Sequence, residues 1–205
     1  MNMEHNIYIV FSATPNRVGK MVRRVTKEEF NHASIALDAD LSRMYGFARR
    51  YYRTPLYGGF VRESLSRYHQ EGQASIIRIC KIPVTEEQYK ELEQLLTKME
   101  NDRDHYLYNH LSALGAVVHR RVYAKDAYTC IEFCVDILHK LGVDIDPKQH
   151  YTICQVAQML LPYSVYYGPI PQGDYDTDFY AKRPVPLPVC TTLRDMFKLL
   201  PRLGK

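Results

Sequence analysis

The chain has 205 residues, of which 46% are hydrophobic and 24% charged, an ordinary balance for a globular protein with a substantial core. The formal net charge of +4 is too small to indicate nucleic-acid binding by itself. No apolar run reaches the roughly 18 residues that a transmembrane helix needs, and the first residues lack the pattern of an export leader. We therefore expect a cytoplasmic protein, with one domain over residues 1–205 in which 162–205 is a C-terminal extension packed on the rest.

The cysteines argue against both a disulfide framework and a metal site. They are odd in number and scattered along the chain, at Cys80, Cys130, Cys134, Cys154 and Cys190. This usage fits a reducing compartment. There is no C-x-x-C pair, the histidines lack metal-ligand spacing, and no phosphate-binding or dinucleotide fingerprint is present. We expect neither a metal ion nor another cofactor.

The strands fall mainly in the first half of the chain. Apolar and β-branched runs predict strands over residues 7–11, 31–37, 44–50 and 75–82. Pro83 bounds the last of these, and Asp38–Asp40 forms a polar turn after the second. Pro55 and Gly58–Gly59 predict a loop over 54–60.

The helices fall mainly in the second half. An early basic helix to Val25 is predicted by Thr14 as its N-cap and Pro15 at its first position. Thr85 and Gln88 have the spacing of a capping box, which opens another helix. We further predict helices over 106–118, 153–161 and 192–200, a short strand over 165–167 and an irregular stretch over 183–188. The chain therefore reads as an α+β protein.

A cysteine stands at the start of one more amphipathic helix. Ile131, Cys134 and Leu138 recur at helical spacing after Cys130, and Gly142 is a C-cap signal that ends the helix. A thiol at a helix N-terminus faces unpaired N–H groups and the positive end of the helix dipole. Both favour the thiolate, which is the reactive form.

A histidine leads the second predicted strand. His32 has the residue type that takes a proton from a nucleophile near neutral pH, and Cys130 has the type that attacks a carbonyl. Each also has a structural interpretation, because free cysteine is among the most buried residue types and a strand histidine commonly packs or faces solvent. The spacing alone does not decide between the two interpretations.

Four segments together resemble a known superfamily. In chain order they are Asn31-His32-Ala33-Ser34-Ile35-Ala36-Leu37-Asp38, Met44-Tyr45-Gly46-Phe47-Ala48-Arg49, Gly58-Gly59-Phe60-Val61-Arg62-Glu63 and Tyr128-Thr129-Cys130-Ile131-Glu132-Phe133. The set resembles the circularly permuted branch of the NlpC/P60 papain-like superfamily, the YiiX/YebB-like hydrolases of bacteria. The resemblance covers most of residues 7–160. It implies a central antiparallel sheet packed against helices, with the histidine strand before the cysteine helix and the nucleophile at a helix N-terminus.

The resemblance implies that Cys130 and His32 are catalytic, and it leaves the third residue open. Related enzymes place a polar residue on the strand after the histidine strand, where this chain offers Tyr45 and Arg49. Glu63, in the predicted loop after Gly58–Gly59, is another candidate. Arg49 is also a candidate for binding an anionic substrate group, and Tyr128 is a further substrate-binding candidate.

The expected function is that of a cysteine hydrolase of the amidase or peptidase type. It would cleave an amide bond in a peptide or other small amide, including a cell-wall-derived fragment, through a thioester acyl-enzyme. Two alternatives stay open: a lipid or other acyltransferase of the same superfamily, and a binding module with weakened catalysis. We expect no nucleic-acid partner and no membrane span, and the oligomeric state is not predicted.

Overall fold

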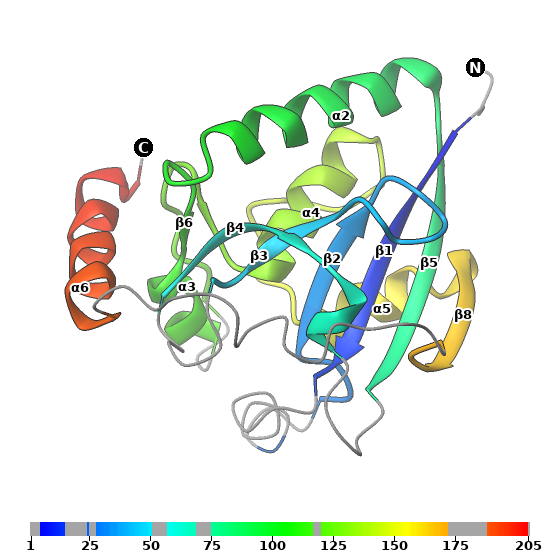
Figure 1. Cartoon of the computed structure of the whole chain (residues 1–205), viewed down its shortest axis with the longest axis horizontal. Coiled ribbons are helices and arrows are strands. Elements are labelled where there is room, and N and C mark those ends of the chain that lie inside the picture. Colours follow the sequence, from blue (N-terminus) through cyan, green and yellow to red (C-terminus); the bar gives the residue numbers. More distant parts are fainter. Residues whose placement is uncertain are drawn as a thin grey trace.

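The computed structural model describes residues 5–14, 24, 28–50, 57–68, 75–116, 120–171 and 188–204. This part of the chain forms an α+β fold around an eight-stranded sheet, in the order β7-β6-β4-β3-β2-β1-β5-β8 (Figure 1). The strands are β1 His5–Ala13, β2 His32–Ala36, β3 Met44–Arg49, β4 Gly58–Glu63, β5 Ile76–Val84, β6 Leu107–Tyr108, β7 Ala127–Tyr128 and β8 Ser164–Pro169. The described helices are α2 Glu86–Asn101, α3 His110–Gly115, α4 Cys130–Lys140, α5 Ile153–Met159 and α6 Pro188–Leu199, with short 3-10 turns over Leu65–Arg67, Leu161–Tyr163 and Leu200–Arg202.

The sheet is mixed, which corrects the expectation of an antiparallel one. Every pairing from β6 through β4, β3, β2, β1 and β5 to β8 is antiparallel. The pairing of β6 with β7 is parallel. The chain between these two-residue strands includes α3 and returns to the same end of the sheet, as a parallel pair requires.

The prediction of a loop over 54–60 is wrong for its described part, because Gly58, Gly59 and Phe60 begin strand β4. The two glycines mark a close approach of another segment and not a turn. A Cβ at Gly59 would lie 2.8 Å from the Tyr106 carbonyl oxygen, and one at Gly58 would lie 3.0 Å from the Tyr108 Cβ. The preceding residues 51–56, including Pro55, lie outside the described residues.

Two other predicted elements have different boundaries in the structure. Residues 107–108 form strand β6, so the helix predicted over 106–118 shrinks to α3. Strand β5 continues through Pro83 to Val84. Its pairing with β8 ends at Cys80, so the missing N–H of Pro83 removes no hydrogen bond to that neighbour. The helix predicted from Thr14 to Val25 and the stretch 183–188 fall almost wholly outside the described residues.

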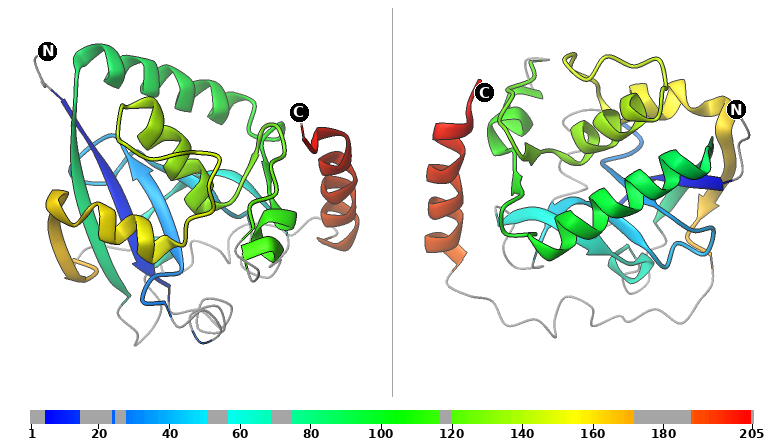
Figure 2. Two further views of the ribbon diagram at one scale, coloured as in Figure 1. Left: turned by 180° about the vertical axis from the view of Figure 1, so that it is seen from behind. Right: turned by 90° about the horizontal axis from the view of Figure 1, so that it is seen from above.

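Helices α2, α4 and α5 pack against one face of the sheet. Their buried side chains join Ile9, Ile35 and Phe47 of the central strands in the largest apolar cluster. Figure 2 shows the three helices grouped along the strands, with α6 standing apart at the β6–β7 end. Phe133 of α4 is 1% exposed in this cluster. Burial of such a side chain stabilises the fold by about 2 kcal/mol, which helps to fix the position of α4.

The predicted ends of two helices are confirmed. Thr85 and Gln88 form the capping box that opens α2. Gly142, with a φ of +84°, follows the last turn of α4 in the left-handed conformation that glycine adopts without strain.

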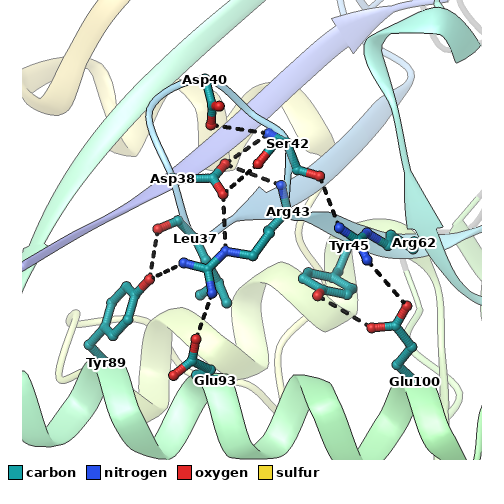
Figure 3. Close-up of polar contacts among 10 residues, drawn as sticks. All are labelled: Leu37, Asp38, Asp40, Ser42, Arg43, Tyr45, Arg62, Tyr89, Glu93 and Glu100. Carbon is teal, nitrogen blue, oxygen red and sulfur yellow. Dashed lines mark hydrogen bonds and ion pairs between the residues drawn. The ribbon is translucent and has the colours of Figure 1, made fainter.

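A polar network ties the turn after β2 to helix α2 (Figure 3). Asp38 accepts hydrogen bonds from the Ser42 N–H at 2.8 Å and from Arg43 Nε at 3.1 Å. Arg43 continues to Glu93 and to the Tyr89 hydroxyl of α2, each at 2.6 Å. The polar turn predicted at Asp38–Asp40 therefore also anchors the long helix against the sheet.

The described parts of the C-terminal segment contact the rest of the chain at both ends of the sheet. Strand β8 pairs with β5, and Leu199 of α6 packs against Leu107, Ala124 and Ala127. The organisation as one domain with a C-terminal extension stays a prediction. Among the described helices, none is long and apolar enough to cross a bilayer.

Candidate active site

The N-terminus of α4 carries Cys130 and is firmly held. Thr129 is the N-cap: its side chain accepts from the Glu132 N–H, while Glu132 Oε2 accepts from the Thr129 N–H at 2.8 Å. The Glu132 carboxylate also accepts a hydrogen bond from Ser112 and lies 3.3 Å from Arg121 Nε. As the first helical residue, Cys130 has an N–H with no partner inside the helix, so this group is free to serve as an oxyanion donor.

His32 opens strand β2 and faces two functional groups. Its Nε2 lies 2.8 Å from Oε1 and 3.1 Å from Oε2 of Glu63. The neighbouring Cys130 side chain also raises the pKa of the His32 ring, through hydrogen bonding and charge. Because Nε2 faces the carboxylate, Nδ1 is the ring nitrogen left for the sulfur. Residues 98 positions apart in the sequence thus meet at the start of α4.

The two side chains of this pair are largely but not fully covered. Cys130 is 7% exposed and His32 is 8% exposed. A sulfur that is sealed inside, without an imidazole beside it, would have excluded thiol chemistry. In the structure Cys130 has the imidazole beside it and keeps a small exposed fraction.

The pKa values show that the His32–Glu63 contact is an ion pair at neutral pH. Burial alone lowers the pKa of His32, but the negative charge of Glu63 and the hydrogen bonds to Cys130 and Glu63 outweigh it and raise the pKa to about 9. Burial alone raises the pKa of Glu63, but the positive charges of His32 and Arg67 and the hydrogen bonds from His32 and Tyr68 lower it to about 2. A charged imidazole next to a thiol favours the thiolate.

Of the three candidates for the third residue, the structure brings Glu63 to His32. It is the last residue of β4, opposite Met44 of β3, and not a loop residue as predicted. Tyr45 is directed elsewhere, because its hydroxyl donates to Glu100 of α2. Arg49 ends β3 and its positive charge acts on Tyr108.

Tyr108 is a neighbour of the site that the sequence analysis missed, because its segment was predicted as helix. Burial raises the pKa of its hydroxyl first, and the negative charges of Cys130 and Glu132 raise it further, while Arg49 lowers it. Tyr108 therefore lies near both the sulfur and Arg49, and its hydroxyl stays protonated as a possible donor. Strand β6 has only two residues, so no periodic pattern in the sequence identified it.

Tyr128 lies two residues before Cys130, and its ring packs into the core. The ring centroid is 5.1 Å from that of Phe47 and 6.1 Å from that of Phe133. Burial is the first cause that raises the pKa of its hydroxyl. These contacts give the Tyr128 ring a packing role in the core, so a substrate-binding role stays a prediction.

The other cysteines are in different environments. Cys134 is fully buried one turn after Cys130, and burial raises its pKa well above the usual range. Burial also raises the pKa of Cys80 to about 11. Cys190 is exposed, and Cys154 is half-buried. Within the described ranges, no three histidine, cysteine or acidic side chains gather as metal ligands.

Comparison of the chain with models of known protein families, with curated proteins and with solved structures found no match in any of the three. The function is therefore argued from the geometry of Cys130, His32 and Glu63.

Proposed function

We propose that this protein is a cysteine hydrolase with a permuted papain-like arrangement, in which Cys130 is the nucleophile, His32 is the acid and base, and Glu63 orients His32. The observation that carries the proposal is the contact of one imidazole with both the Cys130 sulfur and the Glu63 carboxylate at a helix N-terminus. A thiol hydrolase needs these three roles in this order.

The reaction proceeds in two steps. The Cys130 thiolate attacks the carbonyl carbon of an amide and forms a C–S bond, while the Cys130 N–H stabilises the oxyanion. The His32 imidazolium then gives its proton to the leaving nitrogen, and the C–N bond breaks to leave a thioester. In the second step His32 takes a proton from water and the hydroxide attacks the thioester carbon. The C–S bond then breaks, the carboxylic acid leaves, and the Cys130 thiolate is restored beside the His32 imidazolium.

The substrate proposal is an amide bond in a peptide, with cell-wall-derived fragments among the candidates. The resemblance of the motifs supports this class of substrate. Arg49, whose charge acts on Tyr108 beside Cys130, supports a substrate that carries a carboxylate near the scissile bond.

Glu63 also bears on the proposal of a binding module with weakened catalysis. That alternative was motivated by the lack of a conventional polar residue on the strand after the histidine strand. Glu63 supplies a carboxylate from the following strand at 2.8 Å from His32. The geometry therefore favours a complete catalytic set over a weakened one.

The test is to trap the acyl-enzyme. The protein is incubated with a panel of short peptide amides and N-acyl amino acids, quenched in acid and analysed by peptide mass spectrometry. We expect an added acyl mass on Cys130 that hydroxylamine removes, and no adduct in Cys130→Ala. Transfer of the acyl group to an added amine or alcohol in place of water would instead identify an acyltransferase, and no adduct with any substrate would contradict both.

A further inference from the structure

Tyr68 brings a hydroxyl group into an otherwise apolar region on the opposite face of the sheet from α4. Its side chain is 0% exposed and belongs to the cluster of Val10, Ala36, Met44 and Ile77. A buried hydroxyl destabilises a protein unless it is hydrogen-bonded. The Tyr68 hydroxyl donates its one proton to Glu63 Oε2, in the carboxylate of the candidate site.

Ser34 supports the same oxygen from a different strand. It lies two residues after His32 on β2, and alternation along a strand places both side chains on one face. Its Oγ donates to Glu63 Oε2 at 3.1 Å and lies 3.1 Å from the Tyr68 hydroxyl. Two hydroxyl donors therefore converge on Oε2, while Oε1 makes the shorter contact, 2.8 Å, with His32.

The charges around Glu63 keep this arrangement in one protonation state near neutral pH. His32 and Arg67 are the positive groups whose charges act on the carboxylate, while Tyr68 and Cys134 are its neutral titratable neighbours. Burial, followed by the charge of Glu63, raises the pKa of Tyr68 well above its usual range. Tyr68 thus remains a donor to the charged Glu63 carboxylate near neutral pH.

We infer that Tyr68 and Ser34 are positioning residues, which fix Oε2 of Glu63 so that Oε1 orients the His32 ring toward Cys130. This inference rests on the proposed function, because it assigns the two hydroxyls a role in that same site. Both hydroxyls reach Glu63 Oε2, and Ser34 Oγ also lies 3.2 Å from His32 Nε2, so the two residues hold the Glu63–His32 pair from one side. Mobility of the carboxylate would misalign the imidazole, and small misplacements of catalytic groups are costly.

The experiment compares Tyr68→Phe with the wild type by carbon NMR of the Glu63 carboxyl and by the rate of Cys130 alkylation with iodoacetamide near neutral pH. Loss of a hydrogen bond to a charged group should raise the pKa of Glu63 by about one unit and slow alkylation about tenfold. Tyr45→Phe is the matched control, because it removes a hydroxyl of another buried tyrosine that donates to a glutamate, Glu100. It should change neither quantity.

Ser34→Ala provides a second variant should Tyr68→Phe fail to fold. We expect it to raise the pKa of Glu63 and to slow Cys130 alkylation, each by less than Tyr68→Phe does. The inference is overturned if the Glu63 titration or the alkylation rate in both variants equals that of the wild type. Failure of the proposed function looks different: Cys130 of the wild-type protein would then react no faster than the exposed Cys190, whatever the Glu63 titration shows.

Discussion

The Glu63 carboxylate lies over Gly46, so closely that a Cβ atom at position 46 would be 2.6 Å from Glu63 Oε1. Gly46 belongs to β3, and Glu63 reaches across it from β4 toward His32 on β2. A side chain at position 46 would occupy the space in which the carboxylate sits. The pairing of a glycine with a long acid thus allows a residue two strands away to orient the histidine.

Gly46→Ala should therefore displace the carboxylate and disconnect it from His32. We expect alkylation of Cys130 near neutral pH to slow about tenfold or more, since a hydrogen bond to a charged group is lost. A double-mutant cycle with Glu63→Ala supplies the control. If the clash is with Glu63, the alanine at position 46 should have almost no further effect once Glu63 is removed, whereas equal effects in both backgrounds would refute this role.

Glu63→Gln should change the pH dependence of alkylation. The neutral amide removes the negative charge that raises the pKa of His32, so the imidazole will be uncharged over more of the neutral range. Cys130 alkylation should then fall most strongly at mildly acidic and neutral pH, and converge with the wild-type rate under alkaline conditions. A uniform loss at every pH would show that Glu63 acts through structure and not through charge.

The His32–Glu63 pair should also make stability depend on pH. The pKa of His32 is raised from 6.5 to about 9, so the stability it contributes is complete below 6.5 and is lost as the pH rises through about 9. The pKa of Glu63 is lowered from 4.5 to about 2, so its contribution is present above 4.5 and is lost as the pH falls toward about 2.

Urea unfolding of the wild type and of His32→Gln measures this contribution. The free energies of unfolding should differ most between pH 4.5 and 6.5. There the difference should be on the order of 3 kcal/mol, and it should shrink toward about pH 10. A difference that is the same at all pH values would mean that His32 stabilises the fold by packing and not as a charged partner of Glu63.

The N-cap of α4 should matter for reactivity as well as for stability. Thr129→Ala removes the side-chain acceptor of the capping box and should lower the free energy of unfolding by about 1 kcal/mol. Thr85→Ala is its matched control, because Thr85 has the same capping role at the start of α2 and a similar burial. Both variants should lose similar stability, but only Thr129→Ala should slow alkylation of Cys130. If the two variants alkylate Cys130 at equal rates, the N-cap of α4 does not contribute to the reactivity of Cys130.

The helices and central strands could be predicted because their signals are local. The capping box of Thr85 and Gln88, the apolar stripe after Cys130 and the glycine at position 142 each act within a few residues, and each gives the boundary that the structure has. The short strands β6 and β7 could not be predicted in the same way. A two-residue strand has no periodicity, and its partners are supplied by distant segments.

The third member of the site shows the same limit more sharply. His32 and Cys130 were identifiable from their residue types and from the resemblance of the segments around them. Glu63 was only one of three candidates, because the glycines before it suggested a loop. Glu63 can reach His32 because Gly46 has no side chain to block its carboxylate. The hydroxyls of Ser34 and Tyr68, from other segments, also bind this carboxylate. None of these relations exists until the sheet has formed.

The most direct test of the account is the competition between Cys130 and Cys190 for iodoacetamide at mildly acidic pH. Cys190 is exposed and Cys130 is only 7% exposed, so access alone predicts that Cys190 reacts first. The account predicts the opposite order, because the charged His32 ring favours the thiolate of Cys130, and it predicts that His32→Ala abolishes this preference. Faster alkylation of Cys190 in the folded wild-type protein would contradict the central claim.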